Sequence, residues 1–243
     1  MFGLPLKVLI SIALLAVIAL AGCSKAAAKE VNLQFANHLQ MGMPEQDVFL
    51  EKKGGRADQV VRVEGNEAKD STILSKEAYA TASATPHDPF KLGSNPLGPY
   101  TKGAKLGFKL QQWLDASGSG TYTVTGNDAE LKLSFDKLVH DATYTVWCSR
   151  LSFPPKVDFV VTPCGKADGS QNSLKTDKNG KATFNVKMPK LADSSKETAS
   201  VIILGYHSDG KTWGANPGES GLNSHFQIVA LIPTPDDKAW TTK

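Results

Sequence analysis

Hydrophobic and polar residues alternate along most of the chain from residue 105 onward. Leu131, Leu133 and Phe135 are separated by charged or hydroxyl residues, and the segment 182–188 repeats this pattern. A period of two residues is typical of strands with one buried face. Similar short segments, separated by turn-rich stretches rather than by long amphipathic helices, cover residues 121–125, 143–150, 157–161, 200–206 and 226–232. The pattern predicts a mainly β fold, namely an antiparallel two-sheet β-sandwich.

Segments outside this series are less regular. Residues 31–35 and 59–63 alternate like strands, whereas 75–84 is rich in Ala, Ser and Thr and predicts a short helix or a linker. Residues 106–114 fit either a strand or one face of a helix. The Asp-Lys-Asn-Gly sequence at 177–180 is typical of a hairpin turn that leads into the next strand.

Two segments resemble the entry into a strand of immunoglobulin-like and fibronectin-like sandwiches. They are residues 138–147, which include Tyr144 and Trp147, and residues 176–184. The resemblance concerns architecture only and covers residues 105–235. It implies an immunoglobulin-like sandwich, a fold that carries many unrelated functions.

The chain begins with a segment of the kind that directs export. Lys7 precedes an apolar run over residues 8–21, which is too short to cross roughly 30 Å of hydrocarbon as a permanent helix. A charged start, a short apolar core and small residues at its end are typical of a secretory signal. The sequence Leu20-Ala21-Gly22-Cys23 then resembles the lipobox of bacterial lipoproteins residue by residue.

This resemblance implies cleavage before Cys23, diacylglycerol on the Cys23 sulfur and a further fatty acid, such as palmitate, on the new amino group. We therefore expect the membrane to be a partner through this anchor and the protein to belong to the cell envelope. In a two-membrane bacterium, Ser24 favours the outer membrane, facing the periplasm or the surface. In a one-membrane bacterium, the expected place is the outer face of the cytoplasmic membrane.

These features divide the chain into five parts. Residues 1–22 are the signal peptide and 23–30 a lipid-anchored tether, and residues 31–104 are an N-terminal extension or a small module. Residues 105–235 are the sandwich and 236–243 a C-terminal tail. Whether the N-terminal part stands apart or wraps the sandwich is left open by the pattern.

The charge of the chain is close to balanced, with a formal net charge of +3. Removal of the signal peptide takes Lys7 away and leaves 26 basic against 24 acidic residues. Arginine occurs only at Arg56, Arg62 and Arg150. Because proteins that read nucleic acids favour arginine and clustered basic faces, we expect no nucleic-acid partner.

Two cysteines remain once Cys23 carries lipid, and an even pair in an oxidising compartment predicts a disulfide. Cys148 and Cys164 lie on neighbouring predicted strands, and a hairpin folded about residue 156 places them opposite each other. Such a bridge contributes roughly 3 kcal/mol to stability. A redox-active or metal-binding pair is the alternative, but the chain lacks a Cys-x-x-Cys motif.

The longest loop of the predicted sandwich, residues 208–224, joins two strands that end in histidines. If Tyr206 pairs with Phe226, then His207 faces His225 with Cβ atoms ~5 Å apart, which is close enough to share a metal ion. Neutral imidazole suits copper or zinc. The alternative is that both rings anchor the loop through hydrogen bonds.

Other metal ligands are present in the sequence. Asp209 in the loop offers an oxygen ligand, and His38 with Met41 and Met43 forms a separate thioether and imidazole set of the kind that selects Cu(I). The methionines equally suit apolar gaps. Apart from this copper or zinc alternative, no cofactor is expected.

Sequence motifs of catalysis are absent: the chain contains no Gly-x-Ser-x-Gly elbow, no His-Glu-x-x-His pair and no phosphate-binding loop. Our first hypothesis is therefore a lipid-anchored, non-catalytic protein with a binding or structural role. In the binding role it recognises an envelope protein or glycan through Trp213, Asn216 and Glu219 of the 208–224 loop. The second hypothesis is an envelope metal-binding protein. The third is a hydrolase without a sequence motif, built from the serines, histidines and Asp209 of this hairpin.

Overall fold

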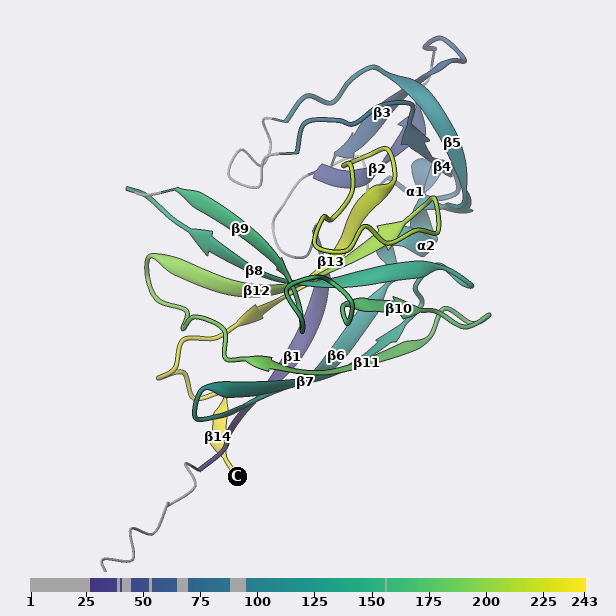
Figure 1. Cartoon of the computed structure of the whole chain (residues 1–243). Coiled ribbons are helices and arrows are strands. Elements are labelled where there is room, and N and C mark those ends of the chain that lie inside the picture. The colour runs from purple at the N-terminus through teal and green to yellow at the C-terminus, as the bar shows by residue number, and fades with distance from the viewer. Residues whose placement is uncertain are drawn as a thin grey trace, which may run out of the picture.

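The computed structural model describes residues 27–38, 40, 45–52, 54–64, 70–87, 95–155 and 157–243 (Figure 1). These residues form fourteen strands and two short helices, which confirms the mainly β prediction. The strands build two antiparallel sheets and, at one end, a small four-stranded barrel. The predicted signal peptide (residues 1–22), Cys23, Met41 and Met43 lie outside the described residues.

The first sheet follows the alternation seen in the sequence. In β7, Leu131, Leu133 and Phe135 are buried while the residues between them face outward. The sheet orders its strands as β1 (Lys29–Asn37), β6 (Ser117–Thr125), β7 (Asp128–Asp136) and β11 (Ala182–Pro189).

The second sheet packs its inner face against the first and buries Tyr144, Val146, Ile202 and Leu204 in the common core. Its outer face carries a separate, smaller apolar cluster around Trp147. The strand order is β10 (Ser173–Lys175), β8 (Thr143–Ser152), β12 (Thr198–His207) and β13 (Ser224–Ile232), with β9 (Asp158–Pro163) also paired to β8.

Strand β1 joins the two sheets. Residues 29–35 pair with β6, and Ala36 and Asn37 pair with β13. The C-terminal strand β14 (Trp240–Thr242) pairs with the beginning of β1. Residues assigned from the sequence to an extension and a tail therefore form part of the sandwich.

The small barrel contains β2 (Glu45–Glu51), β3 (Gln59–Glu64), β4 (Glu77–Thr81) and β5 (Tyr100–Lys109), with helix α1 (Ser71–Leu74) before β4. The prediction of a helix or linker over residues 75–84 is wrong, because β4 lies there. Ala78 and Ala80 point inward and are fully buried. Small side chains fit the narrow interior of a four-stranded barrel, so the alanines mark a strand here.

The segment 106–114, which fits either a strand or a helix by its pattern, contains the end of a strand and a short helix. Strand β5 ends at Lys109, and helix α2 (Leu110–Leu114) begins at the next residue. Leu110 and Trp113 of α2 are completely buried. The helix therefore covers the core where the barrel meets the sandwich (Figure 1).

The predicted disulfide between Cys148 and Cys164 is present, with Cα atoms 5.0 Å apart. The predicted register of its hairpin is wrong, because Cys148 lies opposite Thr162. Cys164 instead follows the end of β9, and its main-chain N–H donates to the carbonyl of Val146. The chain turns one residue earlier than the pattern indicated.

The turn at residues 177–180 is present, but it does not form the predicted hairpin. It connects β10 to β11, and these strands pair with β8 and β7 in different sheets. Nearby, the Tyr144 hydroxyl accepts the N–H of Val139 at 3.0 Å. A tyrosine hydroxyl bonded to the backbone a few residues upstream is common in immunoglobulin-like sandwiches.

The beginning of β1 and the C-terminus lie at the same end of the molecule, and the barrel lies at the other end (Figure 1). Within the described residues, neither helix is long and apolar enough to cross a membrane. The length of the sandwich thus separates the beginning of β1 from the barrel.

Candidate functional site

The predicted pairing of His207 with His225 is wrong. Strands β12 and β13 pair Tyr206 with His225 and His207 with Ser224, because the register shifts after Leu204. Neighbouring residues of a strand point to opposite faces of the sheet. The two imidazole rings therefore belong to different faces.

The register shift results from one inserted residue. Gln227 lies between Phe226 and Ile228, which pair with consecutive residues of β12. Its side chain is completely buried. It accepts a hydrogen bond from the Tyr144 hydroxyl at 2.8 Å and donates to the carbonyl of Trp113 at 3.0 Å. These two bonds hold the bulge in place.

His207 belongs to a buried polar chain on the outer face of the second sheet. Its Nε2 lies 2.7 Å from the hydroxyl of Thr145, which also accepts the indole N–H of Trp147 at 2.7 Å. Burial lowers the pKa of His207 to about 4. The ring is consequently neutral at pH 7 and ties two strands together.

His225 connects the 208–224 loop to the barrel. Its Nδ1 lies 2.7 Å from the main-chain carbonyl of Asp47, and a carbonyl only accepts, so Nδ1 carries the proton. Nε2 then accepts from the Ser208 hydroxyl at 3.0 Å. Burial lowers the pKa of His225. The side chain bonds to a residue at the start of the loop and to strand β2.

Within the described residues, no group of three or more His, Cys, Asp or Glu side chains is placed to hold a metal ion. Asp209 is exposed and its carboxylate accepts the N–H of Lys211 at 3.0 Å. His38 is buried, and its ring lies 6.4 Å from that of His87. The remaining members of that second set, Met41 and Met43, lie outside the described residues.

A buried ion pair sits where the barrel meets the sandwich. The guanidinium of Arg62 donates to the Asp47 carboxylate at 2.7 Å, and the two side chains are 0% and 1% exposed. Arg62 also donates to the Thr85 hydroxyl at 2.9 Å. The Asp47 carboxylate accepts the N–H of Phe226 in β13 at 3.1 Å. We call Asp47, Arg62, Thr85, His87 and His225 the junction cluster.

The acid of the junction cluster lies beside basic side chains. His87 Nδ1 lies 3.0 Å from the Asp47 carboxylate. Burial by itself raises the pKa of Asp47, but the charges of His87 and Arg62 outweigh it and hold that pKa far below its ordinary value. Asp47 is therefore ionised, and the cluster binds the barrel to the sandwich.

The sequence contains a signal for this ion pair, which our predictions did not include. Asp47 directly precedes Val48-Phe49-Leu50, and Arg62 lies between Val61 and Val63. Charged residues are almost never fully buried unless they are paired. One acid and one base within two short apolar strands therefore indicate a buried pair.

The 208–224 loop packs its second half onto the barrel. The carbonyls of Ser220 and Gly221 accept the main-chain N–H groups of Thr85 and Thr81. The first half is open, and Trp213 keeps 46% of its surface exposed.

The other two predicted loop residues stabilise turns. Asn216 accepts the N–H of Gly218 through its side chain at 2.9 Å, and the main-chain carbonyl of Glu219 accepts the N–H of Ser224 at 3.1 Å. Their side chains nevertheless lie on the exposed surface of the loop.

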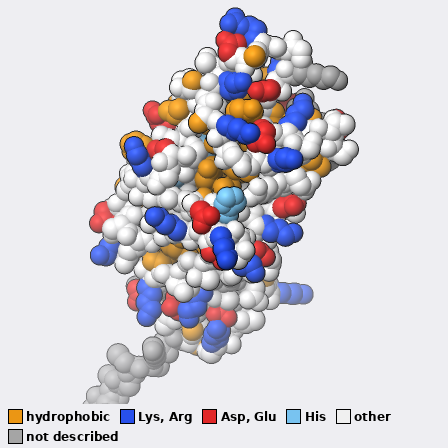
Figure 2. Space-filling model, turned by 90° about the vertical axis from the view of Figure 1, so that its right-hand side faces the viewer, with side chains coloured by type: hydrophobic (Ala, Val, Ile, Leu, Met, Phe, Trp, Pro, Cys, Tyr) orange, Lys and Arg blue, Asp and Glu red, His pale blue; other side chains and the backbone are white. Residues whose placement is uncertain are grey.

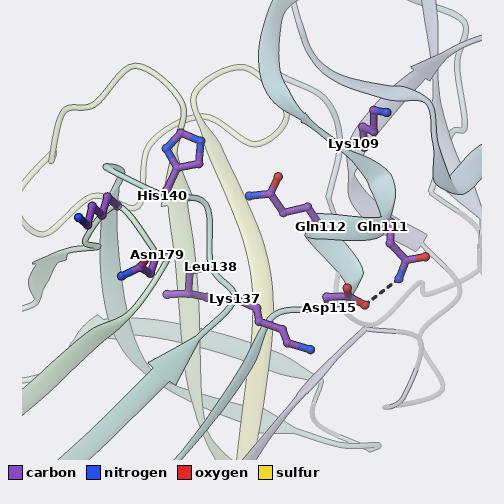
Figure 3. A pocket seen from close by; sticks show the side chains of 9 residues that line it. Lys109, Gln111, Gln112, Asp115, Lys137, Leu138, His140 and Asn179 are labelled. Carbon is purple, nitrogen blue, oxygen red and sulfur yellow. Dashed lines mark hydrogen bonds between the residues drawn. The ribbon is translucent and has the colours of Figure 1, made fainter.

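A cleft of about 450 Å³, lined mostly by residues with polar or charged side chains, lies beside α2. Figure 3 shows Gln111, Gln112 and Asp115 on one side and His140 and Asn179 on the other. The sequence pattern did not reveal it, since the lining comes from three separate segments of the chain: Lys109, Gln111, Gln112, Asp115, Lys137, Leu138, His140, Lys178 and Asn179. We call it the α2 cleft.

No protein-family model matches this chain, and no curated protein matches it.

Proposed function

We propose that this protein is a lipid-anchored, non-catalytic binding protein of the bacterial cell envelope, with the exposed half of the 208–224 loop as its recognition surface. The lipobox ending at Cys23 supports the anchor. Several acyl chains, at ~0.8 kcal/mol per buried CH₂, make such an anchor stable. The exposed aromatic side chain of Trp213 is the observation that favours binding at the loop.

The path of β1 supports an outward orientation of this surface. The strand begins at Lys29, six residues after Cys23, and ends at Asn37, whose side chain donates to the carbonyl of Leu114 in α2. Nine residues of extended chain span roughly 30 Å. An anchor at Cys23 thus holds the barrel and the loop away from the bilayer.

The sandwich presents Trp213 at little conformational cost. Turns within the loop and the hydrogen bonds of Ser220 and Gly221 to the barrel fix the backbone on either side of the exposed segment. Aromatic residues on ordered loops provide a large contact area with few rotatable bonds. Basic and acidic side chains are interspersed over the face shown in Figure 2. On this face, recognition therefore depends on individual side chains and not on a large surface of one charge.

Site-specific photocrosslinking in the native bacterium tests this proposal. A photoreactive phenylalanine analogue replaces Trp213, and a matched variant carries it at Leu231, which is 48% exposed on β13. We expect a discrete crosslinked species at position 213 that is missing at position 231. The same products at both positions, or none at 213, would overturn the assignment of the loop.

One observation favours a second candidate function, hydrolysis. Ser208 and His225 have the donor and acceptor arrangement of a nucleophile and its base. The main-chain carbonyl of Asp47 orients the base, His225. The carboxylate of Asp47 does not take this role, since it is bonded to Arg62, His87 and a main-chain N–H. A fluorophosphonate probe tests this function: labelling that disappears in Ser208→Ala supports it, and absence of labelling rejects it.

A further inference from the structure

The α2 cleft has an excess of positive charge. It is lined by Lys109, Lys137 and Lys178, and the one acid in its lining is Asp115. Within the described residues, none of these three ammonium groups has a carboxylate within 4 Å, and the Asp115 carboxylate accepts a hydrogen bond from Gln111 at 2.7 Å. The charges are therefore open to a ligand.

One wall of the α2 cleft is held rigidly. The main-chain N–H of Leu138 donates to the carbonyl of Gly180 at 3.0 Å, and the hydroxyl of Thr176 donates to the carbonyl of Val139 at 2.6 Å. Lys137 is one of two described non-glycine residues with a positive φ, at 58°. Such a conformation persists only when its surroundings determine it, so the main chain at Lys137 is fixed before a ligand arrives.

The opposite wall is also fixed. Trp113 of α2 stacks on Phe108 with ring centroids 5.7 Å apart, and both side chains are buried. This contact holds α2 in place. Figure 3 shows Gln112 directed toward His140 across the cleft, whereas Gln111 is turned toward Asp115. Lys109, the last residue of β5, stands at the start of the helix.

The chemistry of the lining selects a particular kind of ligand. Ammonium groups bind carboxylates or phosphates, and side-chain amides both donate to and accept from hydroxyl groups. Two amides, from Gln112 and Asn179, accompany the three lysines, and the amide of Gln111 is bonded to Asp115. The volume of about 450 Å³ lies in the range of roughly 300–1,000 Å³ that is usual for small-ligand sites.

From these observations we infer that the α2 cleft binds an acidic sugar unit, either free or within an anionic glycan of the envelope. The inference takes the envelope location from the proposed function and adds a second binding site, whose lining contains no residue of the 208–224 loop. The position of the cleft agrees with this inference. Lys137 of the cleft follows Asp136, the last residue of β7, which pairs with Ser117. The next residue, Gly118, pairs with Phe35 near the end of β1. The cleft thus lies away from the end of the molecule at which β1 begins.

Calorimetric titration of the mature chain carrying Cys23→Ser tests the inference with defined probes. Tetragalacturonate supplies carboxylates and hydroxyls, maltotetraose supplies hydroxyls alone, and citrate supplies carboxylates alone. We expect binding of tetragalacturonate that is at least about tenfold tighter than that of either other probe. The monomer, galacturonate, separates a free sugar from a glycan, because a polymer ligand binds more tightly than its single unit.

Paired variants place the binding in the cleft. Lys137→Gln with Lys178→Gln removes two cleft charges, and Lys166→Gln with Lys196→Gln removes two exposed charges elsewhere. We expect about tenfold weaker tetragalacturonate binding for the first pair and no change for the second. No binding by the parent chain, equal effects of both pairs, or equal binding of maltotetraose would each overturn the inference. Acylation of Cys23 and crosslinking at position 213 do not depend on these lysines, so the proposed function is tested separately.

Discussion

Asp47 and Arg62 form an ion pair of 2.7 Å from which water is almost wholly excluded, and the same carboxylate accepts the N–H of Phe226 in the sandwich. The pair connects β2 and β3 of the barrel to β13. Because removal of one partner leaves a buried charge without compensation, this junction is a sensitive point of the fold.

We expect Asp47→Asn to lower the free energy of unfolding by about 3–5 kcal/mol. The exposed pair Arg56–Asp58, with side chains 75% and 59% exposed, provides a matched control. Asp58→Asn should cost less than about 1 kcal/mol. Urea unfolding at pH 7 measures both values, and similar small losses in the two variants would contradict a stabilising role of the junction pair.

Acid should destabilise the protein through its buried histidines. The folded-state pKa of His207, about 4, lies below its ordinary value of 6.5, so the unfolded chain takes up the proton first as the pH falls. The stability that the neutral His207 ring contributes to the folded protein is fully present above pH 6.5. It is lost between pH 6.5 and 4, at about 1 kcal/mol for each pH unit. His225 acts in the same direction.

The comparison of two variants isolates this effect. The difference in unfolding free energy between pH 7.5 and 4.5 should shrink in His207→Gln and stay at the parent value in His140→Gln, whose side chain is exposed. A parent-like difference in His207→Gln would show that the acid sensitivity arises elsewhere.

The disulfide should stabilise the fold by closing a loop of 16 residues. The double variant Cys148→Ala with Cys164→Ala is expected to lose roughly 3 kcal/mol of unfolding free energy. Chemical denaturation measures this loss, and thiol titration of the denatured parent chain reports whether the bridge is formed. Two free thiols in the exported protein would refute the bridge.

Gly221 should be needed to dock the 208–224 loop on the barrel. It has a φ of +77°, and a Cβ there meets the Thr85 hydroxyl at 2.6 Å, whereas Gly210 has a φ of +71° and open space around it. Both alanine variants carry the strain of a positive φ, about 1 kcal/mol. Gly221→Ala adds a clash and should cost roughly 3 kcal/mol in total. Equal losses in thermal or urea unfolding would show that the loop is not docked at this position.

The fold was predictable from the sequence where the determinants are local. Alternation within β7 decides which side chains face the core, and the two cysteines other than Cys23 leave a single pairing. Ala78 and Ala80 were misread because small residues fit both a helix and the interior of a narrow barrel. Nothing in a single sequence distinguishes these two environments.

The site was less predictable because its determinants are far apart in the chain. The bulge that separates His207 from His225 depends on Gln227 bonding to Tyr144 and Trp113, which are 83 and 114 residues away. The α2 cleft likewise combines residues from positions 109–115, 137–140 and 178–179. Periodicity reports burial along one strand, but it does not report which strands meet.

The proposed function depends most on the lipid anchor, and mass spectrometry of the N-terminal peptide from the native membrane fraction tests this anchor directly. We predict a peptide that begins at Cys23 and carries diacylglycerol on sulfur with a fatty acid on its amino group. A peptide that retains residues 1–22, or an exported chain whose Cys23 is unmodified, would contradict the proposed place of this protein in the envelope.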